Sequence, residues 1–549
     1  MADQDQTSPD QQAGGPGPTA AGSDVPDIEV SGEVIGPTAG EAGRLASAER
    51  TARALRAHAG AAVGRVGSVV ESAASAVLPQ PDPDAVVPRR LTGFDFATWR
   101  SASNDPAMRS PIIGLVVLES SPDWDRLVDR FDRASRIATV MRQKVVEGPT
   151  DILNPRLVVD PDFDLSFHLR RFRVADPGTW DQVLDETRRQ SLSDFDLARP
   201  LWRATVLEGL AGGRAVLIVK LHHAIADGQG AMMIGANTID LDPRGQALGP
   251  MPPAPVPAEL DTSGFLTHAV RDAGSVVLRA AKDVADGALP LASRTIRDPV
   301  GAVEDLLHVL RSVGKFAAVP SRAMSPVMTG RSINYHFVTF DVPLAELKAV
   351  SKEHRMTLND AFMAGVTGGL RIYHERRGEP VERLRCNVPI NLRNPERPAQ
   401  NAVTIARFEV PVDIVDPVER MKVIHDLLEQ WRNEPALYLA DPLAEVGSRV
   451  MPQDLITTTA RRSDFTASNV PGVPVPVWVA GAKVLAMYPM VGTIGAACNV
   501  TLLSYNGNAG LGVSMDDVAI PDREEFVGCL GAGFEEVVGH PVGPSDPIG

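Results

Sequence analysis

Cysteine, aromatic residues and positive charge are all scarce in this chain. Its 549 residues include 3 Cys, 5 Tyr, 6 Trp and 16 Phe. The three cysteines, Cys386, Cys498 and Cys529, are too few and too widely spaced for a disulfide framework or a zinc cluster. The first residues, MADQD, show no basic segment followed by an apolar run, so no secretory signal is visible. We therefore expect a reducing, cytoplasmic location.

The charge balance argues against a nucleic-acid-binding surface. Acidic residues outnumber basic ones by 69 to 54, whereas binding to nucleic acid needs a basic face. Residues 1–43 contain eight acidic residues and no Lys or Arg, so the other 506 residues carry only 7 of the 15 net negative charges. The rest of the chain is thus mildly acidic, and its charge alone identifies no partner.

Composition divides the chain into five segments. Residues 1–40 are rich in Gly, Pro, Ser, Asp and Gln and predict a disordered acidic tail. Residues 41–90 predict a helix and a Pro-rich linker; the Ala- and Val-rich helix face either packs on protein or lies at a lipid surface. Alternating strand and helix patterns predict two α/β subdomains, residues 91–248 and 333–543. Residues 249–332 predict a Pro-rich and helical connector between them.

A stretch of 51 residues from Phe465 to Met515 contains a single charged residue, Lys483. Prolines and glycines interrupt it too often for a membrane-spanning helix, which needs about 20 consecutive apolar residues. We therefore predict buried strands and turns. They form either ordinary core or the lining of a site for an apolar substrate, and the length of the stretch favours the second interpretation.

The segment most indicative of chemistry is RAVLIVKLHHAIADGQG, residues 214–230. Its apolar run, Ala215–Val219, predicts a strand that is buried on both faces and leads directly into His222 and His223. Side chains alternate along a strand, so only one of the two imidazoles can face a given cavity. Histidine is the natural general base near neutral pH.

Asp227 and Gly228 complete this segment. Asp227 stands four residues after His223, where its carboxylate either orients the imidazole or braces the turn, and Gly228 allows a tight turn before a predicted helix over Ala231–Ile239. A metal site is a weaker interpretation because it needs three or more convergent ligands, and no second cluster has suitable spacing. A purely structural histidine pair is also open, but we favour catalysis.

The pattern His-His-x-x-x-Asp-Gly after an apolar strand resembles the signature of the chloramphenicol-acetyltransferase-like superfamily. Within it, the chain looks like the bacterial wax ester synthase/diacylglycerol acyltransferase family. Five further motifs carry this resemblance: Leu91-Thr92-Gly93-Phe94-Asp95, Pro200-Leu201-Trp202, Asn359-Asp360, Ser468-Asn469-Val470-Pro471-Gly472 and Ser504-Tyr505-Asn506-Gly507. The chain departs from the family at Gly93 and Phe94, and at Gln400, which replaces a glycine before Asn401. The first 90 residues have no counterpart in the family core.

The resemblance implies an α/β fold of two chloramphenicol-acetyltransferase-like subdomains, each a mixed sheet flanked by helices, with a channel between them. It implies that His223 takes the proton of an acceptor hydroxyl, which attacks the thioester of a long-chain acyl-CoA. His222 would support the turn or contribute secondarily. Asp227 would be mainly architectural, held by an arginine such as Arg393. Acyl-CoA is a substrate here, and neither cofactor nor metal is expected.

The resemblance also suggests where substrates bind. Asn469, or a backbone N–H near it, is the candidate donor to the developing oxyanion. The substrate-binding candidates are Trp202, Gly228, Asn359, Asp360, Asn469, Pro471 and Gly472. Trp202 is more simply explained by packing, the Asn359–Asp360 pair by a helix cap, and the segment around Pro471 by a turn.

The expected product is triacylglycerol, wax ester or both. Its acceptor, diacylglycerol or a fatty alcohol, dissolves in membranes, so we expect peripheral contact with a membrane or lipid droplet. Two alternatives stay open. The first is a related acyltransferase that uses a carrier-protein thioester, and the second is a non-catalytic lipid-droplet scaffold. The sequence leaves the oligomeric state and the acyl chain length undecided.

Overall fold

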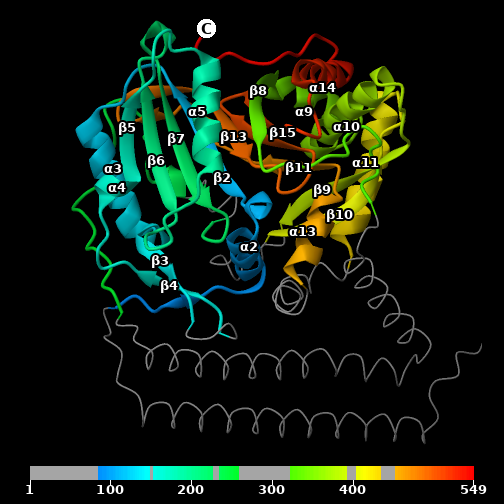
Figure 1. Cartoon of the computed structure of the whole chain (residues 1–549). Coiled ribbons are helices and arrows are strands. Elements are labelled where there is room, and N and C mark those ends of the chain that lie inside the picture. Colours follow the sequence, from blue (N-terminus) through cyan, green and yellow to red (C-terminus); the bar gives the residue numbers. More distant parts are fainter. Residues whose placement is uncertain are drawn as a thin grey trace, which may run out of the picture. The chain divides into compact units, whose positions relative to one another are not determined.

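Two six-stranded mixed sheets organise the computed structural model (Figure 1). The structure describes residues 85–148, 153–226, 231, 234–258, 322–391, 403–434 and 452–549. We call the sheet of order β12-β13-β2-β7-β6-β5 the N-terminal sheet and the sheet of order β10-β9-β11-β14-β15-β8 the C-terminal sheet. A small antiparallel sheet, β1-β4-β3, accompanies them.

The N-terminal sheet is antiparallel except for its parallel β5–β6 pair. Its strands are β2 (Pro111–Leu118), β5 (Leu169–Arg173), β6 (Trp202–Glu208), β7 (Ala215–His222), β12 (Trp478–Val479) and β13 (Ala482–Val491). The two central strands β2 and β7 are nearly continuous apolar runs, PIIGLVVL and AVLIVKLH. Such runs form strands that are covered on both faces.

The C-terminal sheet has a parallel centre, β9-β11-β14, flanked by antiparallel pairs. Its strands are β8 (Tyr335–Pro343), β9 (Arg383–Asn391), β10 (Val403–Pro411), β11 (Phe465–Val470), β14 (Cys498–Tyr505) and β15 (Asn508–Asp516). The small sheet contains β1 (Arg89–Arg90), β3 (Gln143–Val146) and β4 (Arg156–Val159). The nearly uncharged stretch of the sequence therefore folds into buried strands and turns, as predicted.

Helices cover both sheets. The described helices are α2 (Gly93–Asn104), α3 (Trp124–Ile137), α4 (Leu165–His168), α5 (Trp180–Leu192), α9 (Leu344–Glu353), α10 (Leu358–Arg376), α11 (Pro417–Arg432), α13 (Gln453–Arg461) and α14 (Arg523–Val538). Short 3-10 turns occur at Pro106–Met108, Thr139–Arg142 and Ala211–Gly213. The side chains of Asp123 and Thr179 cap α3 and α5, because each accepts a backbone N–H of its helix.

The strand β13 connects the two sheets. It pairs with β2 in the N-terminal sheet, although its residues lie within the predicted C-terminal subdomain. It also lies directly against β15, because an added Cβ on Gly510 would meet the Met487 carbonyl oxygen at 2.3 Å, and one on Gly512 would meet that of Pro489 at 1.7 Å. Glycine is required at both positions by this close approach of two backbones.

Several segments named by the sequence analysis lie outside the described residues. These are the tail 1–40, the helix expected within 41–78, and most of the connector 249–332. Asp227, Gly228, Arg393, Gln400 and Asn401 are outside as well. The proposed segment boundaries therefore stay predictions. None of the described helices is both long and apolar enough to cross a bilayer.

Candidate active site

An apolar cavity of about 220 Å³ lies between the two sheets. Its wall is formed by β2, β7 and β13 of the N-terminal sheet, by β9, β11 and β14 of the C-terminal sheet, and by residues between 231 and 239. Among the described residues that line this cavity, none is Asp, Glu, Lys or Arg. Such a wall suits a hydrocarbon chain, because burial of apolar surface supplies the affinity.

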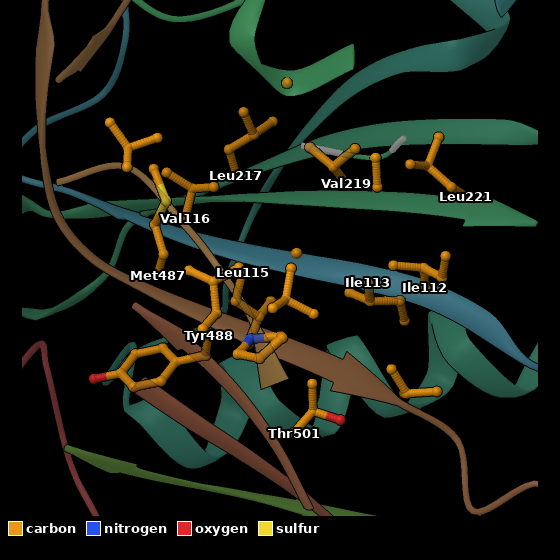
Figure 2. A pocket seen from close by; sticks show the side chains of 18 of the residues that line it. Ile112, Ile113, Leu115, Val116, Leu217, Val219, Leu221, Met487, Tyr488 and Thr501 are labelled. Carbon is orange, nitrogen blue, oxygen red and sulfur yellow. The ribbon is translucent and has the colours of Figure 1, made fainter. Parts of the chain in front are cut away.

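Three transverse rows of residues from β7, β2 and β13 form the cavity floor. The register of these strands places one residue of each in every row. Starting beside His223, the rows are Leu221–Ile112–Val491, Val219–Gly114–Pro489 and Leu217–Val116–Met487. Figure 2 shows Leu217, Val219 and Leu221 following one another along a single strand. From Leu217 to His223 the floor runs about 20 Å, at about 3.3 Å per residue.

His223 lines the cavity at the end of this floor. The strand β7 ends at His222, so His223 is the first residue of the following turn, and its side chain is half-buried. The ring of Phe94 from α2 meets the His223 ring edge-on, with centroids 6.0 Å apart. An imidazole in this position can take a proton from a hydroxyl group that an apolar substrate brings into the cavity.

His222 points away from the cavity and is buried, with 8% of its surface exposed. Its ring contacts the rings of Trp99 and Phe195, each with centroids 5.7 Å away. Its Nδ1 accepts the backbone N–H of Ala224 at 3.0 Å. Burial, then the proximity of His223 and Lys220, lowers the pKa of His222 to about 3. This imidazole is therefore neutral at physiological pH and braces the turn that carries His223.

One helix contacts both imidazoles. The segment Leu91–Asp95 contains the start of α2, which places Phe94 against His223 and Trp99 against His222. Phe94 is one of the two positions where the motif departs from the family pattern, and sequence reasoning assigned it no role. The sequence offered one signal for this contact, which is the aromatic residue at position 94 directly before Asp95.

The C-terminal sheet supplies the polar groups opposite the floor. Ser468 and Asn469 of β11 and Thr501 of β14 all line the cavity. Pairing of β11 with β9 ends at Thr466, whereas its pairing with β14 continues to Val470, so one edge of β11 borders the cavity beyond Thr466. Asn469 is thus in the same cavity as His223, as the oxyanion hypothesis requires.

Pro471 and Gly472 form part of a packed turn, whereas Asn469 lines the cavity. Pro471 is exposed, and neither residue lines the cavity. The N–H of Gly472 donates to the Ser504 hydroxyl at 3.2 Å, and a Cβ on Gly472 would meet the Ser504 carbonyl oxygen at 1.9 Å. The Asn469–Gly472 and Ser504–Gly507 segments therefore brace each other, and this packing explains the glycine.

Asn359 and Asp360 lie at the start of α10 and do not line the cavity. Asp360 is buried and completes a capping box, in which its carboxylate accepts the Thr357 N–H at 2.7 Å. The Nδ1 of His425 lies 2.9 Å from the same carboxylate. The cap accounts for Asp360, and the structure does not bring either residue together with His223.

Trp202 is also separate from the cavity and is 1% exposed. Its ring stacks between Phe131 and His168, with centroids 5.8 and 4.6 Å away. Its Nε1–H donates to the Met141 carbonyl at 2.6 Å. The preceding Leu201 carbonyl accepts the backbone N–H of His222 at 3.0 Å. This motif therefore packs the core and holds the end of β7, so packing explains Trp202 better than substrate contact does.

Comparison with known proteins agrees with this geometry. The model of the wax ester synthase/diacylglycerol acyltransferase catalytic domain matches residues 91–362, and that of the family's C-terminal domain matches residues 399–537. A candidate diacylglycerol O-acyltransferase of Mycobacterium tuberculosis is 37% identical over 83% of this chain and 93% of its own length. The chain belongs to the wax ester synthase/diacylglycerol acyltransferase family. It is accordingly an acyltransferase.

Solved structures share the fold of this chain. The wax ester synthase/diacylglycerol acyltransferase of Marinobacter aquaeolei VT8 matches with a TM-score of 0.55 at 20% identity, covering 82% of this chain and all of that one. The first condensation domain of the calcium-dependent antibiotic synthetase matches with a TM-score of 0.52 at 14% identity, covering 82% and 98%. At these identities the likeness shows the shared fold alone. It confirms the predicted fold class.

The family's catalytic-domain match contains the His pair, and its C-terminal match contains Asn469. Within the described part of the chain, no three His, Cys, Asp or Glu residues are grouped as metal ligands. The catalytic roles of His223, His222 and Asp227 remain predictions. So do the substrate contacts of the other candidate residues.

Proposed function

We propose that this enzyme transfers a long-chain acyl group from acyl-CoA to the hydroxyl of diacylglycerol or a fatty alcohol, with His223 as the general base. The position of His223 carries the proposal. It is half-buried at the end of an apolar cavity whose wall comes from both sheets. The names of the relatives support the substrate class, since the mycobacterial one names diacylglycerol and the Marinobacter one also names wax ester.

The proposed reaction is a direct transfer. A ring nitrogen of His223 takes the proton from the acceptor hydroxyl while the oxygen attacks the thioester carbonyl. The tetrahedral intermediate collapses, the C–S bond breaks, and the thiolate leaves with the proton that the imidazolium returns. A positioned base contributes about 10²–10⁴-fold. No acyl-enzyme, cofactor or metal takes part in this scheme, and acyl-CoA is consumed as a substrate.

The surrounding residues have two proposed roles, which are to position His223 and to stabilise the oxyanion. In our proposal, His222 is a positioning residue that acts through the turn, because its Nδ1 holds the Ala224 N–H. Asn469 stabilises the developing oxyanion from the opposite wall. The resemblance assigns Asp227 an architectural role and places Gly228 near the substrate.

The acceptor's solubility suggests where the enzyme works. Diacylglycerol and fatty alcohols dissolve in membranes and lipid droplets, so we propose peripheral contact of the enzyme with such a surface. Flotation of the full chain with diacylglycerol-containing vesicles tests this point. Recovery of the protein only at the bottom of the gradient would contradict it.

A panel of acceptors with one labelled acyl-CoA tests the proposed activity. Wild-type protein should form labelled ester with diacylglycerol, a fatty alcohol or both, and His223→Ala should lose about 10²-fold or more of this rate. His354, which is half-buried like His223 and does not line the cavity, provides a matched control, and His354→Ala should retain the wild-type rate. Ester formation only from an acyl-carrier-protein donor would support the alternative acyltransferase. Equal rates for wild type and His223→Ala would contradict the catalytic assignment.

A further inference from the structure

A buried lysine stands two residues before the histidine pair. Along β7, the side chains of Ile218, Lys220 and His222 alternate with those that line the cavity, so they face the opposite side of the N-terminal sheet. The helix α5 covers this side of the sheet (Figure 1). Lys220 is only 3% exposed. An ammonium group is costly to bury, so its contacts indicate what it does there.

Lys220 joins β7 to the end of α5. Its Nζ donates to the carbonyl oxygen of Ser193 at 2.6 Å, and Ser193 is the C-cap of α5. The last carbonyls of a helix have no partner within the helix, and the helix dipole favours a cation beside them. The ammonium therefore ties the beginning of the loop 193–201 to the strand that leads into the histidines.

The same ammonium lies over an aromatic ring that contacts His222. The Nζ of Lys220 is 4.2 Å from the centroid of the Phe195 ring, a distance typical of a cation–π interaction. The Phe195 ring also meets the His222 ring, with centroids 5.7 Å apart. At the far end of the loop, the carbonyl of Leu201 accepts the backbone N–H of His222 at 3.0 Å. The loop thus holds His222 at two points, and Lys220 holds the loop.

The position of His222 in turn determines that of His223. The N–H of Ile225 donates to the His222 carbonyl oxygen at 3.0 Å, which closes a tight turn with His223 and Ala224 at its centre. The His222 ring accepts the Ala224 N–H within the same turn. A shift of His222 therefore moves the imidazole of His223. A misplacement of about 1 Å at a reacting group can cost about 10²-fold in rate.

We propose that Lys220 is a positioning residue for the proposed reaction, because its ammonium holds the loop 193–201 against His222 and so aligns His223 with the acceptor hydroxyl. This inference rests on the proposed function, in which His223 is the base. The tether needs the charged form of the lysine, since the face of an aromatic ring attracts a cation. Catalysis should therefore depend on the protonation of Lys220.

The surroundings of Lys220 bring its loss of a proton close to neutral pH. Burial, then the guanidinium of Arg203, lowers the pKa of Lys220 to about 7. Arg203 lies directly opposite Lys220 on β6. The carboxylate of Asp194 raises the pKa of Lys220, whereas Arg109 lowers it further. His222 does not protonate in this range, because its own pKa is about 3. The tether should therefore weaken as the pH rises through about 7.

The pH dependence of kcat tests this proposal with Lys220→Met and Phe195→Leu. Wild-type kcat should fall at low pH, where the base is protonated, and again as the pH rises through about 7. Each variant should lose about tenfold in kcat on the acidic side of this fall, while KM changes by less than about threefold. The fall at high pH should be absent from both variants, because neither retains the contact between the ammonium and the ring.

Controls separate the loss of a tether from damage to the fold. Lys144 is partly buried in the same half of the molecule and donates to Asp160 at 2.9 Å, so Lys144→Met should keep the wild-type pH profile. The thermal midpoint of Lys220→Met should stay close to that of wild type, because relief from burying an ammonium offsets one lost hydrogen bond. If Lys220→Met does not fold, Phe195→Leu decides the question. A wild-type fall at high pH in either folded variant would overturn the proposal, as would a raised KM with unchanged kcat.

A spectroscopic measurement distinguishes this inference from the proposed function. Nuclear magnetic resonance follows the ring signals of isotope-labelled histidine, and His222→Asn identifies the signal of His222. Because His222 itself stays neutral, a shift of its signal as the pH passes about 7 reports Lys220 and Phe195. Such a shift in wild type and its absence from Lys220→Met would support the tether even if no ester forms, which would contradict only the proposed reaction. A constant His222 signal in wild type would overturn the tether even if the reaction proceeds.

Discussion

The buried imidazole of His222 should make the stability of the enzyme fall as the pH is lowered. In the unfolded chain a histidine protonates near pH 6.5, whereas burial lowers the pKa of folded His222 to about 3. The unfolded state therefore binds the extra proton first. The contribution of His222 to the free energy of unfolding is complete above pH 6.5 and is lost progressively as the pH falls toward 3.

The magnitude follows from these two pKa values. Between about pH 7.5 and pH 5, the loss from this one group is about 2 kcal/mol, and it approaches about 5 kcal/mol near pH 3. His222→Asn provides the perturbation, since an amide oxygen can still accept the Ala224 N–H but does not protonate in this range. When the pH is lowered from 7.5 to 5, the free energy of unfolding of the variant should fall by about 2 kcal/mol less than that of wild type.

Urea unfolding of both proteins at the two pH values measures this difference by linear extrapolation. His540 offers a control of opposite sign, because hydrogen bonding to Glu346 raises its pKa. The stabilising contribution of His540 is present at low pH and is lost as the pH rises through the raised pKa. Because His540→Asn lacks this contribution, its free energy of unfolding should fall slightly more than that of wild type when the pH is lowered. If lowering the pH reduced the free energy of unfolding equally in wild type and His222→Asn, the conclusion that His222 is buried and neutral would be refuted.

Three further substitutions test the other motif residues. Asn469→Ala should lower kcat about 10²-fold without lowering the thermal midpoint, and an unchanged kcat would remove Asn469 from the oxyanion site. Gly472→Ala should destabilise the fold by about 1–3 kcal/mol in urea unfolding, because its Cβ would meet the Ser504 carbonyl oxygen at 1.9 Å; unchanged stability would contradict this packing. Asp360→Ala should cost about 1 kcal/mol through loss of the α10 cap, while KM for both substrates stays the same; a raised KM would instead support the substrate-binding prediction.

Local patterns in the sequence were sufficient to locate most elements of the fold. The apolar run Ala215–Val219 predicts a strand, and the structure has β7 over Ala215–His222. The nearly uncharged stretch Phe465–Met515 predicts buried strands and turns, and it contains β11, β12, β13, β14 and nearly all of β15. Both predictions rest on apolar composition, which is a local property of the chain.

Strand pairing was not predictable in the same way. One of the two strands paired with β13 is β2, which lies more than 300 residues earlier in the chain. Periodicity shows that residues 482–491 are a strand but contains no information about which sheet they join. The pairing is decided by tertiary packing, including the close contact of β13 with Gly510 and Gly512.

The candidate site was predictable where the chemistry depends on one side chain, and less so where packing competes with binding. The His pair was correctly expected to present only one imidazole to a cavity, and His223 is the one that lines it. The sequence does not distinguish a carboxylate that caps a helix, as Asp360 does, from one that binds substrate. It also does not distinguish a tryptophan that packs in the core, as Trp202 does, from one that contacts substrate.

The origin of β13 also constrains how this enzyme can be made. One of the three strands of the cavity floor comes from residues 482–491, so a ribosome must translate nearly the whole message before the complete cavity can form. A nascent chain that ends before this point leaves the outer hydrogen-bonding edge of β2 without its partner. Co-expression of residues 85–258 and 322–549 as separate polypeptides should therefore yield activity only when the two pieces associate, and neither piece should bind a fatty chain by itself.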